Sequence, residues 1–425
     1  MAATMWRVTS KFSPYFSRLS ATNLLRRCPV RRCVTGLVKE KYDDSYFPPI
    51  APYRTEEEQV RDKLFDQVRS VETSQEMLKI LTKGQAWTYM PRSFNVSPGC
   101  LMYYQHITKT VIVNELPKSL TNNVDIEAAV TEMVPSLVEC VEQEFSYCDR
   151  RNLTWQKYNS RPRQRARWVQ ESLIRAIIAS QCGEYPHLMT CEADFDTEIK
   201  SFWLRDDYRY QINENPWISI RTVDPLNEIV DINDDLSVNS EIPICLYLPK
   251  SMNTFKKQIK NISFPGYKMQ DDKLQHGHTQ IIVPLIFDRQ RCIVEKLLHE
   301  RLNGIGLITG FGWANAFAMS QKHYWFDDIK EPMVVQVIHT NDAQHYTFYV
   351  YQLNTIALDP LSEKTNNKHN IMWTSGEMKL FQDIQDGKII GWNYDVLKYY
   401  IMFLLNKTRS GITANPLIKK LETEN

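Results

Sequence analysis

The spacing of apolar positions divides the chain into a helix-rich first half and a strand-rich second half. In the first half, apolar residues recur every three or four positions, which is the period of an amphipathic helix. The helices predicted in this way cover residues 55–71, 74–81, 168–181 and a stretch beginning at Asp125. Pro135 is expected to kink or split the helix that begins at Asp125, because proline lacks the amide hydrogen. One apolar run, residues 107–113, predicts a strand.

From about residue 200, short β-branched and aromatic runs alternate with Pro, Asn and Asp, which is typical of strands and turns. These runs occupy residues 217–223, 228–232, 244–248, 279–287, 332–340 and 345–353. The last two flank residues 341–344 and predict an antiparallel hairpin. Residues 292–302 and the stretch capped by Asn393 predict helices. The expected fold class is α+β, with a helical N-terminal half and a mostly antiparallel sheet with packed helices in the C-terminal half.

Residues 302–321 carry no charge but contain four glycines. A membrane-spanning helix needs roughly 20 predominantly apolar residues, and this stretch is too polar and too interrupted. The segment GIGLITGFG at 304–312 invites comparison with a dinucleotide-binding loop, but such a loop follows a strand and opens a helix. Here it follows a predicted helix. We therefore expect no membrane span and no cofactor, and interpret the glycines as a helix stop with close backbone packing.

Charge is distributed unevenly along the chain. The first 39 residues contain eight basic and no acidic residues, whereas residues 40–425 contain 43 basic and 50 acidic residues, a net charge of −7. An N-terminus rich in Arg and Ser without acids is typical of a mitochondrial transit peptide. A basic tail that contacts nucleic acid is the alternative. The domains expected are a transit peptide over 1–35, an extended Pro-rich arm over 36–54 and one large α+β domain over 55–425, with a candidate sub-boundary near 185–205.

His276 and His278 flank a glycine, an arrangement that can hold zinc. Zinc needs four converging donors, usually His, Cys or carboxylate. The next histidine along the chain is His299, inside a predicted helix, and no His-Glu-x-x-His or cysteine pair accompanies it. We expect the two histidines to lie in a loop entering the following strand, with imidazoles bonded to backbone groups. No catalytic motif was found, so the chain is expected to hold no metal and not to be an enzyme.

One local run is strongly basic. Residues 150–168 contain seven basic residues, no acid and interleaved aromatics. The candidate RNA-binding residues are Arg150, Arg151, Trp155, Lys157, Arg161, Arg163, Arg165, Arg167 and Trp168. Guanidinium groups bind phosphate and, like aromatic rings, stack on bases. An acidic protein partner or an ordinary solvated surface are the alternatives. Because Pro162 disfavours a helical Arg161, an extended segment would place its alternating arginines on one face. A helix would spread them around its axis.

Seven short segments resemble a single family. They read LKILTKGQAWTYMP at 78–91, YYQHITKTV at 103–111, DDYRYQINENPWISI at 206–220, HGHTQ at 276–280, YQLNTIALD at 351–359, NIMW at 370–373 and FLLNK at 403–407. The family comprises mitochondrial ribosomal proteins catalogued first as small-subunit protein thirty and later as large-subunit protein sixty-five, also called programmed cell death protein nine. The resemblance covers nearly the whole chain beyond residue 45, in the same order.

This resemblance implies a structural constituent of the mitochondrial large ribosomal subunit, located in the matrix and supporting mitochondrial translation. It also implies contact with large-subunit rRNA, pairing with the related large-subunit protein thirty-seven, and contact with other large-subunit proteins. It brings no catalytic, cofactor-binding or metal-binding residues. The basic run of the family lies where residues 150–168 lie here, but its arginines are arranged differently, so only the region is transferred. A matrix enzyme of unknown reaction is the competing function.

Overall fold

The computed structural model describes most of the chain beyond residue 55. The described residues are 56–72, 76–77, 80, 85–93, 96–97, 99–121, 124–150, 161–245, 247–266, 273–284, 295–324, 328–358, 366–385 and 388–409. The chain divides into two compact units, Met1–Lys63 and Leu64–Asn425. In the first unit, the described residues are 56–63, which begin helix α2 (Glu56–Arg69). The transit peptide and arm expected before residue 55 lie outside the described residues.

A mostly antiparallel sheet of seven strands forms the centre of the second unit. Its strands, in spatial order, are β2 (Thr110–Val113), β11 (Asn370–Lys379), β10 (His345–Leu353), β9 (Met333–Asn341), β8 (His276–Ile282), β6 (Ile218–Thr222) and β3 (Glu192–Phe195). The pairs β2–β11 and β8–β9 are parallel and the other neighbours are antiparallel. The predicted hairpin is confirmed as β9 and β10, where His345 pairs with Asn341 across the turn.

A smaller sheet of four strands belongs to the same unit. In spatial order its strands are β4 (Ile199–Arg205), β5 (Tyr208–Glu214), β1 (Gln85–Pro91) and β7 (Thr254–Lys260). Strand β1 runs parallel to β5 and antiparallel to β7. A separate two-stranded ribbon joins β12 (Phe381–Gln385) to β13 (Lys388–Trp392). The first half of the chain therefore supplies strands to both larger sheets.

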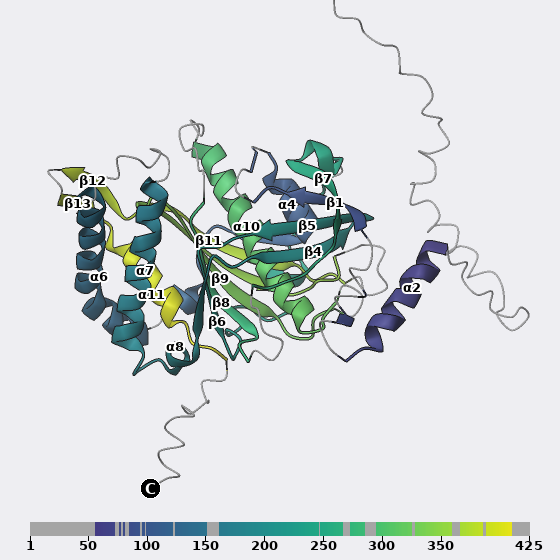
Figure 1. The fold of residues 1–425 in the computed structure, drawn as a ribbon, viewed down its shortest axis with the longest axis horizontal. Helices are drawn as coiled ribbons and strands as arrows, with labels where there is room; N and C mark the ends of the chain where they lie inside the picture. Colours follow the sequence, from purple (N-terminus) through teal and green to yellow (C-terminus); the bar gives the residue numbers. More distant parts are fainter. Residues whose placement is uncertain are drawn as a thin grey trace, which may run out of the picture. The chain divides into compact units, whose positions relative to one another are not determined.

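Helices cover both faces of the seven-stranded sheet (Figure 1). The longer helices are α4 (Leu101–Thr108), α6 (Val124–Arg150), α7 (Arg161–Gln181), α10 (Glu295–Ser320) and α11 (Tyr394–Leu405), and the short ones are α5 (Lys118–Thr121), α8 (Pro186–Thr190), α9 (Asp235–Val238) and the 3-10 turn Pro249–Ser251. Alternate residues of β9 point to opposite sides. Val334 and Ile338 pack with α6, α7 and α11, whereas Val335 and Val337 pack with α4, α10 and the smaller sheet. The α+β fold class is confirmed.

Helix α10 runs without interruption through the glycine-rich segment, so the predicted helix stop is wrong. The helix contacts strands of both larger sheets, and every residue from 302 to 319 is buried, as expected of a helix that packs on all sides. Its glycines lie where neighbouring segments come closest: a Cβ on Gly310 would lie 2.9 Å from the Cβ of Tyr351 in β10, and one on Gly304 would lie 2.8 Å from a methyl of Val96, in the loop between β1 and α4. The expected close backbone packing is therefore present, but inside a helix.

Three other local predictions are wrong in whole or in part. The strand expected over 107–113 begins only at Thr110, because Ile107 and Thr108 end α4 and Lys109 adopts a left-handed conformation (φ 54°) between them. Helix α6 continues past Pro135 as one helix, so the expected split is wrong, while the expected kink stays a prediction. The runs at 228–232 and 244–248 form no strand among their described residues. These described residues instead lie in irregular segments.

Candidate nucleic-acid interface

The basic run of residues 150–168 joins the end of α6 to the first turns of α7. Arg161, Arg163, Arg165, Arg167 and Trp168 lie in α7, so the extended conformation considered for this stretch is wrong. The remaining candidates are placed less fully: Arg151, Trp155 and Lys157 lie outside the described residues, and Arg150 is described only as the last residue of α6. The helix distributes its arginines around its axis.

Two of the helical arginines, one turn apart, hold α7 against the edge of the seven-stranded sheet. A guanidinium nitrogen of Arg167 donates to Asp196 at 3.0 Å, and its central carbon lies 3.8 Å from the centre of the Trp217 ring. The Nε of Arg163 donates to the carbonyl oxygen of Val283 at 3.4 Å. Burial lowers the pKa of both guanidinium groups from the usual value, and each remains a cation.

Arg165 turns towards α6 instead. Its guanidinium carbon lies 4.4 Å from the centre of the Phe145 ring, a cation–π contact. The neighbouring Ala166 and Val169 are fully buried in the same core. Arg163, Arg165 and Arg167 thus already serve the packing of α7. Their charge is less available to a polyanion than the sequence alone indicated.

We expect Arg167→Ala to destabilise the second unit by about 1 kcal/mol, because it removes both a cation–π contact and a partly exposed ion pair. Chemical denaturation of the purified chain measures the change. Arg175→Ala is the matched control, since Arg175 lies on the same helix, is exposed, and pairs with Glu171 at 3.4 Å. Equal, negligible effects of the two substitutions would contradict the anchoring role of Arg167.

The histidine pair lies within β8, not in the loop expected before it. His278 is fully buried, with Nε2 3.0 Å from the carbonyl oxygen of Asn406 and Nδ1 2.9 Å from the hydroxyl of Thr279. Its ring stacks on His187 at 5.3 Å. Burial lowers the pKa of His278 to about 3, so the imidazole is neutral. Among the described residues, no three His, Cys, Asp or Glu side chains are grouped so as to hold a metal ion.

The structure contains a second basic region that was not predicted from the sequence. Strand β7 and the 3-10 turn before it carry Lys250, Lys256, Lys257 and Lys260 without an intervening acid. All four side chains are exposed, and the exposed Trp87 of β1 lies beside Lys256. The available signal was the lysine-rich run TFKKQIK. Its pairing with a tryptophan about 170 residues earlier depends on tertiary structure.

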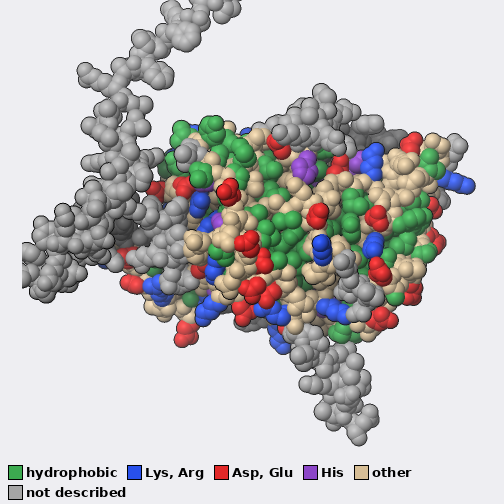
Figure 2. All heavy atoms as spheres, turned by 180° about the vertical axis from the view of Figure 1, so that it is seen from behind, with side chains coloured by type: hydrophobic (Ala, Val, Ile, Leu, Met, Phe, Trp, Pro, Cys, Tyr) green, Lys and Arg blue, Asp and Glu red, His purple; other side chains and the backbone are tan. Residues whose placement is uncertain are grey.

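Elsewhere, basic and acidic side chains are mixed. Figure 2 shows Lys and Arg interspersed with Asp and Glu over one face, with apolar side chains between them. Proteins that coat RNA usually present a continuous basic surface. The described part of this face shows no continuous basic surface of that kind.

Comparison with known families identifies the class of protein. The family model of mitochondrial 28S ribosomal protein S30 (PDCD9) matches residues 18–408. The chain belongs to this family. The matched range includes α7, β1, β7 and the whole of the seven-stranded sheet. Family membership confirms the resemblance to mitochondrial ribosomal proteins, and it makes the mitochondrion the expected location. The family name refers to the 28S particle, whereas the resemblance implied the large subunit.

Proposed function

We propose that this chain is a structural constituent of the mitochondrial large ribosomal subunit and supports mitochondrial translation from a peripheral position. Family membership carries the ribosomal part of the proposal. The net charge of −7 over residues 40–425 favours the periphery, because a protein buried among rRNA helices needs a basic surface. Its partners would be large-subunit rRNA, the related large-subunit protein thirty-seven as a heterodimer, and other large-subunit proteins.

Sedimentation of mitochondrial ribosomes tests the subunit assignment. After the particles are dissociated at low magnesium, the chain should migrate with the large subunit in a sucrose gradient. Migration with the small subunit would contradict the assignment and agree with the 28S particle of the family name. Migration with free soluble proteins would favour the alternative function, a matrix enzyme of unknown reaction.

For RNA contact, the α6–α7 region remains our candidate. Since the guanidinium groups of Arg163, Arg165 and Arg167 contact the protein's own atoms, the charge proposed for rRNA lies mainly at Arg150, Arg151, Lys157 and Arg161. Each contact between a cationic side chain and a phosphate adds to the salt dependence of binding. Removing such a contact therefore makes the salt dependence shallower. Trp155 and Trp168 remain candidates for packing against a base.

Neutralising Arg150, Arg151, Lys157 and Arg161 to Gln should weaken binding of the chain to large-subunit rRNA. The slope of log K against log salt should become shallower by up to about 3. A matched control neutralises four exposed lysines scattered over the second unit, namely Lys273, Lys330, Lys379 and Lys388. Equal losses for both variants would mean that binding follows total charge and that the α6–α7 region is not a specific contact.

The acid-free N-terminus carries a further prediction, that residues up to about Arg31 are removed on import. Terminal peptide mapping of the ribosome-associated protein should find a mature start after Arg31. Recovery of an intact Met1 or Ala2 in the ribosomal fraction would contradict a transit peptide and favour a retained basic tail.

A further inference from the structure

The outer strand of the smaller sheet combines positive charge with exposed aromatic surface. Strand β7 pairs with β1 on one side, and no described strand pairs with its other side. Residues 85–92 and 249–261, which form β1, β7 and the turn before β7, contain Arg92, Lys250, Lys256, Lys257 and Lys260 but no acidic residue. This edge is therefore a local cationic surface on a unit whose charges are otherwise mixed.

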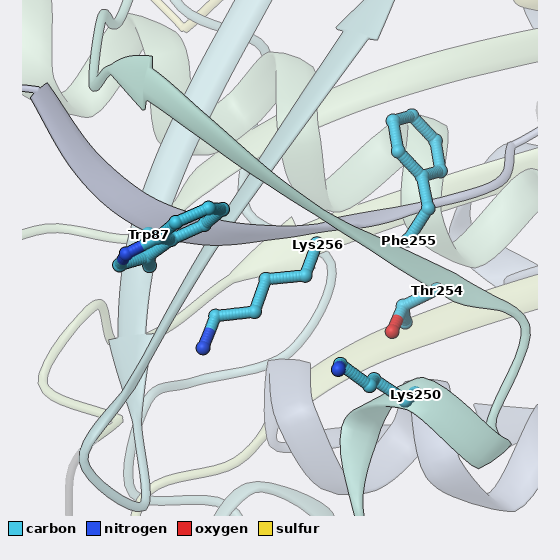
Figure 3. A pocket seen from close by; sticks show the side chains of 5 residues that line it. All are labelled: Trp87, Lys250, Thr254, Phe255 and Lys256. Carbon is cyan, nitrogen blue, oxygen red and sulfur yellow. The ribbon is translucent and has the colours of Figure 1, made fainter.

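Trp87 and Lys256 lie next to each other on this edge. The Trp87 side chain is 59% exposed. The Lys256 ammonium lies 5.3 Å from the centre of the Trp87 ring and 5.4 Å from the centre of the Tyr89 ring. Trp87, Lys250, Thr254, Phe255 and Lys256 line an open pocket. Figure 3 shows Trp87, Lys256 and Lys250 around one open space, while Phe255 projects from the opposite side of β7.

Lysines on an edge strand have an ordinary structural role, because their charge discourages pairing with a strand of another molecule. That role explains Lys256, Lys257 and Lys260. It does not explain Trp87, because an exposed indole beside an open edge promotes association. An aromatic face beside two ammonium groups instead matches the way single-stranded nucleic acid is held, by stacked bases and neutralised phosphates.

We propose that this edge binds an unpaired stretch of RNA, with one base stacked on Trp87 and the adjoining phosphates paired with Lys250 and Lys256. An acidic extended peptide is the competing occupant. It would pair with the free backbone edge of β7 and the lysines, and would leave the indole face of Trp87 without a specific role. The inference rests on the proposed ribosomal function for the source of the RNA, but the binding itself is a property of the isolated chain.

Fluorescence anisotropy of a labelled twelve-nucleotide oligouridylate, titrated with the full chain, tests the proposal. Trp87→Ala should weaken binding by about tenfold, whereas Trp87→Phe, which retains a stacking face, should lose less than about threefold. Lys256→Gln should lower the salt slope of binding by about 0.7 while leaving stacking in place. A duplex RNA of equal length should bind more weakly than the single strand, because its bases are already stacked.

Tyr394→Ala is the matched control, since Tyr394 is 54% exposed at the start of α11, far along the chain from the edge. It should bind the oligonucleotide as the native chain does. Unchanged affinity of Trp87→Ala, or equal affinity for duplex RNA, would overturn the proposal. Binding of polyglutamate that depends on Lys256 but not on Trp87, without binding of oligouridylate, would replace it with the peptide. Failure of this proposal can be told apart from failure of the ribosomal assignment, because that assignment does not depend on Trp87. If the assignment is right, the Trp87→Ala variant should still sediment with the large subunit.

Discussion

Replacing Gly306 by alanine should destabilise the second unit by about 1–3 kcal/mol. In an exposed helix the same change would stabilise by roughly 1 kcal/mol, because alanine is the better helix former. Here the added Cβ would meet the ring carbons of Tyr349, which is fully buried. The Tyr349 hydroxyl donates to the carbonyl oxygen of Leu302 at 2.7 Å, so the ring is held against α10 and cannot swing aside without losing this bond.

Urea denaturation of the purified chain measures the effect, and two variants make it specific. Lys330→Ala changes an exposed residue of the same unit, outside α10, and should alter stability by less than about 0.5 kcal/mol. Adding Tyr349→Leu to Gly306→Ala gives space to the new methyl, so the double variant should be less destabilised than the sum of the single changes. If the effects of Gly306→Ala and Tyr349→Leu on stability are additive, or if Gly306→Ala stabilises the chain, then the stability of α10 does not depend on the close approach of Gly306 to Tyr349.

The second large effect is a pH dependence that originates at Glu214. This residue of β5 is 2% exposed, and its carboxylate accepts a hydrogen bond from Thr309 of α10 at 3.0 Å. Burial raises the pKa of Glu214 to about 7, against 4.5 for the ordinary carboxyl. Between these two values the folded chain holds a proton that the unfolded chain has released. The contribution of Glu214 to the free energy of unfolding therefore falls as pH rises from about 4.5 to about 7, by about 3 kcal/mol in all.

Glu214→Gln keeps an oxygen to accept from Thr309 and removes the titration. Its stability relative to the native chain should thus increase between pH 5 and pH 8 by about 3 kcal/mol. The comparison must be between variants, because buried histidines act in the opposite direction: burial lowers the pKa of His339 to about 4, so its contribution is lost as pH falls below about 6.5.

Glu198→Gln provides the control for this experiment. Glu198 is exposed just before β4 and pairs with Lys200 at 2.8 Å on the surface. Its neutralisation should shift stability by less than about 1 kcal/mol and leave the pH profile parallel to the native one. Parallel native and Glu214→Gln profiles between pH 5 and pH 8 would mean that Glu214 is ionised in the folded chain throughout this range.

Several features follow from sequence because their causes are local. The β9–β10 hairpin needs two alternating β-rich runs and a short polar turn, and these are adjacent along the chain. Helix α11 begins where expected because the Asn393 side chain accepts a hydrogen bond from the amide of Asp395, two residues later. The family resemblance is likewise read directly from short segments, and the match over residues 18–408 confirms it. Sequence by itself therefore determined the fold class, several elements and the ribosomal family.

Tertiary structure decided what the chemically suggestive residues do. The glycines of residues 304–312 looked like a helix stop because the strands that need their small size, at Tyr349 and Tyr351, lie some 40 residues later. Arg165 and Arg167 looked free because Phe145 and Trp217 become neighbours only after α7 packs against α6 and the sheet. Trp87 joins Lys256 through strand pairing between distant segments. Contacts between residues far apart in sequence arise from the packing of whole elements, so periodicity and spacing carry no direct signal of them.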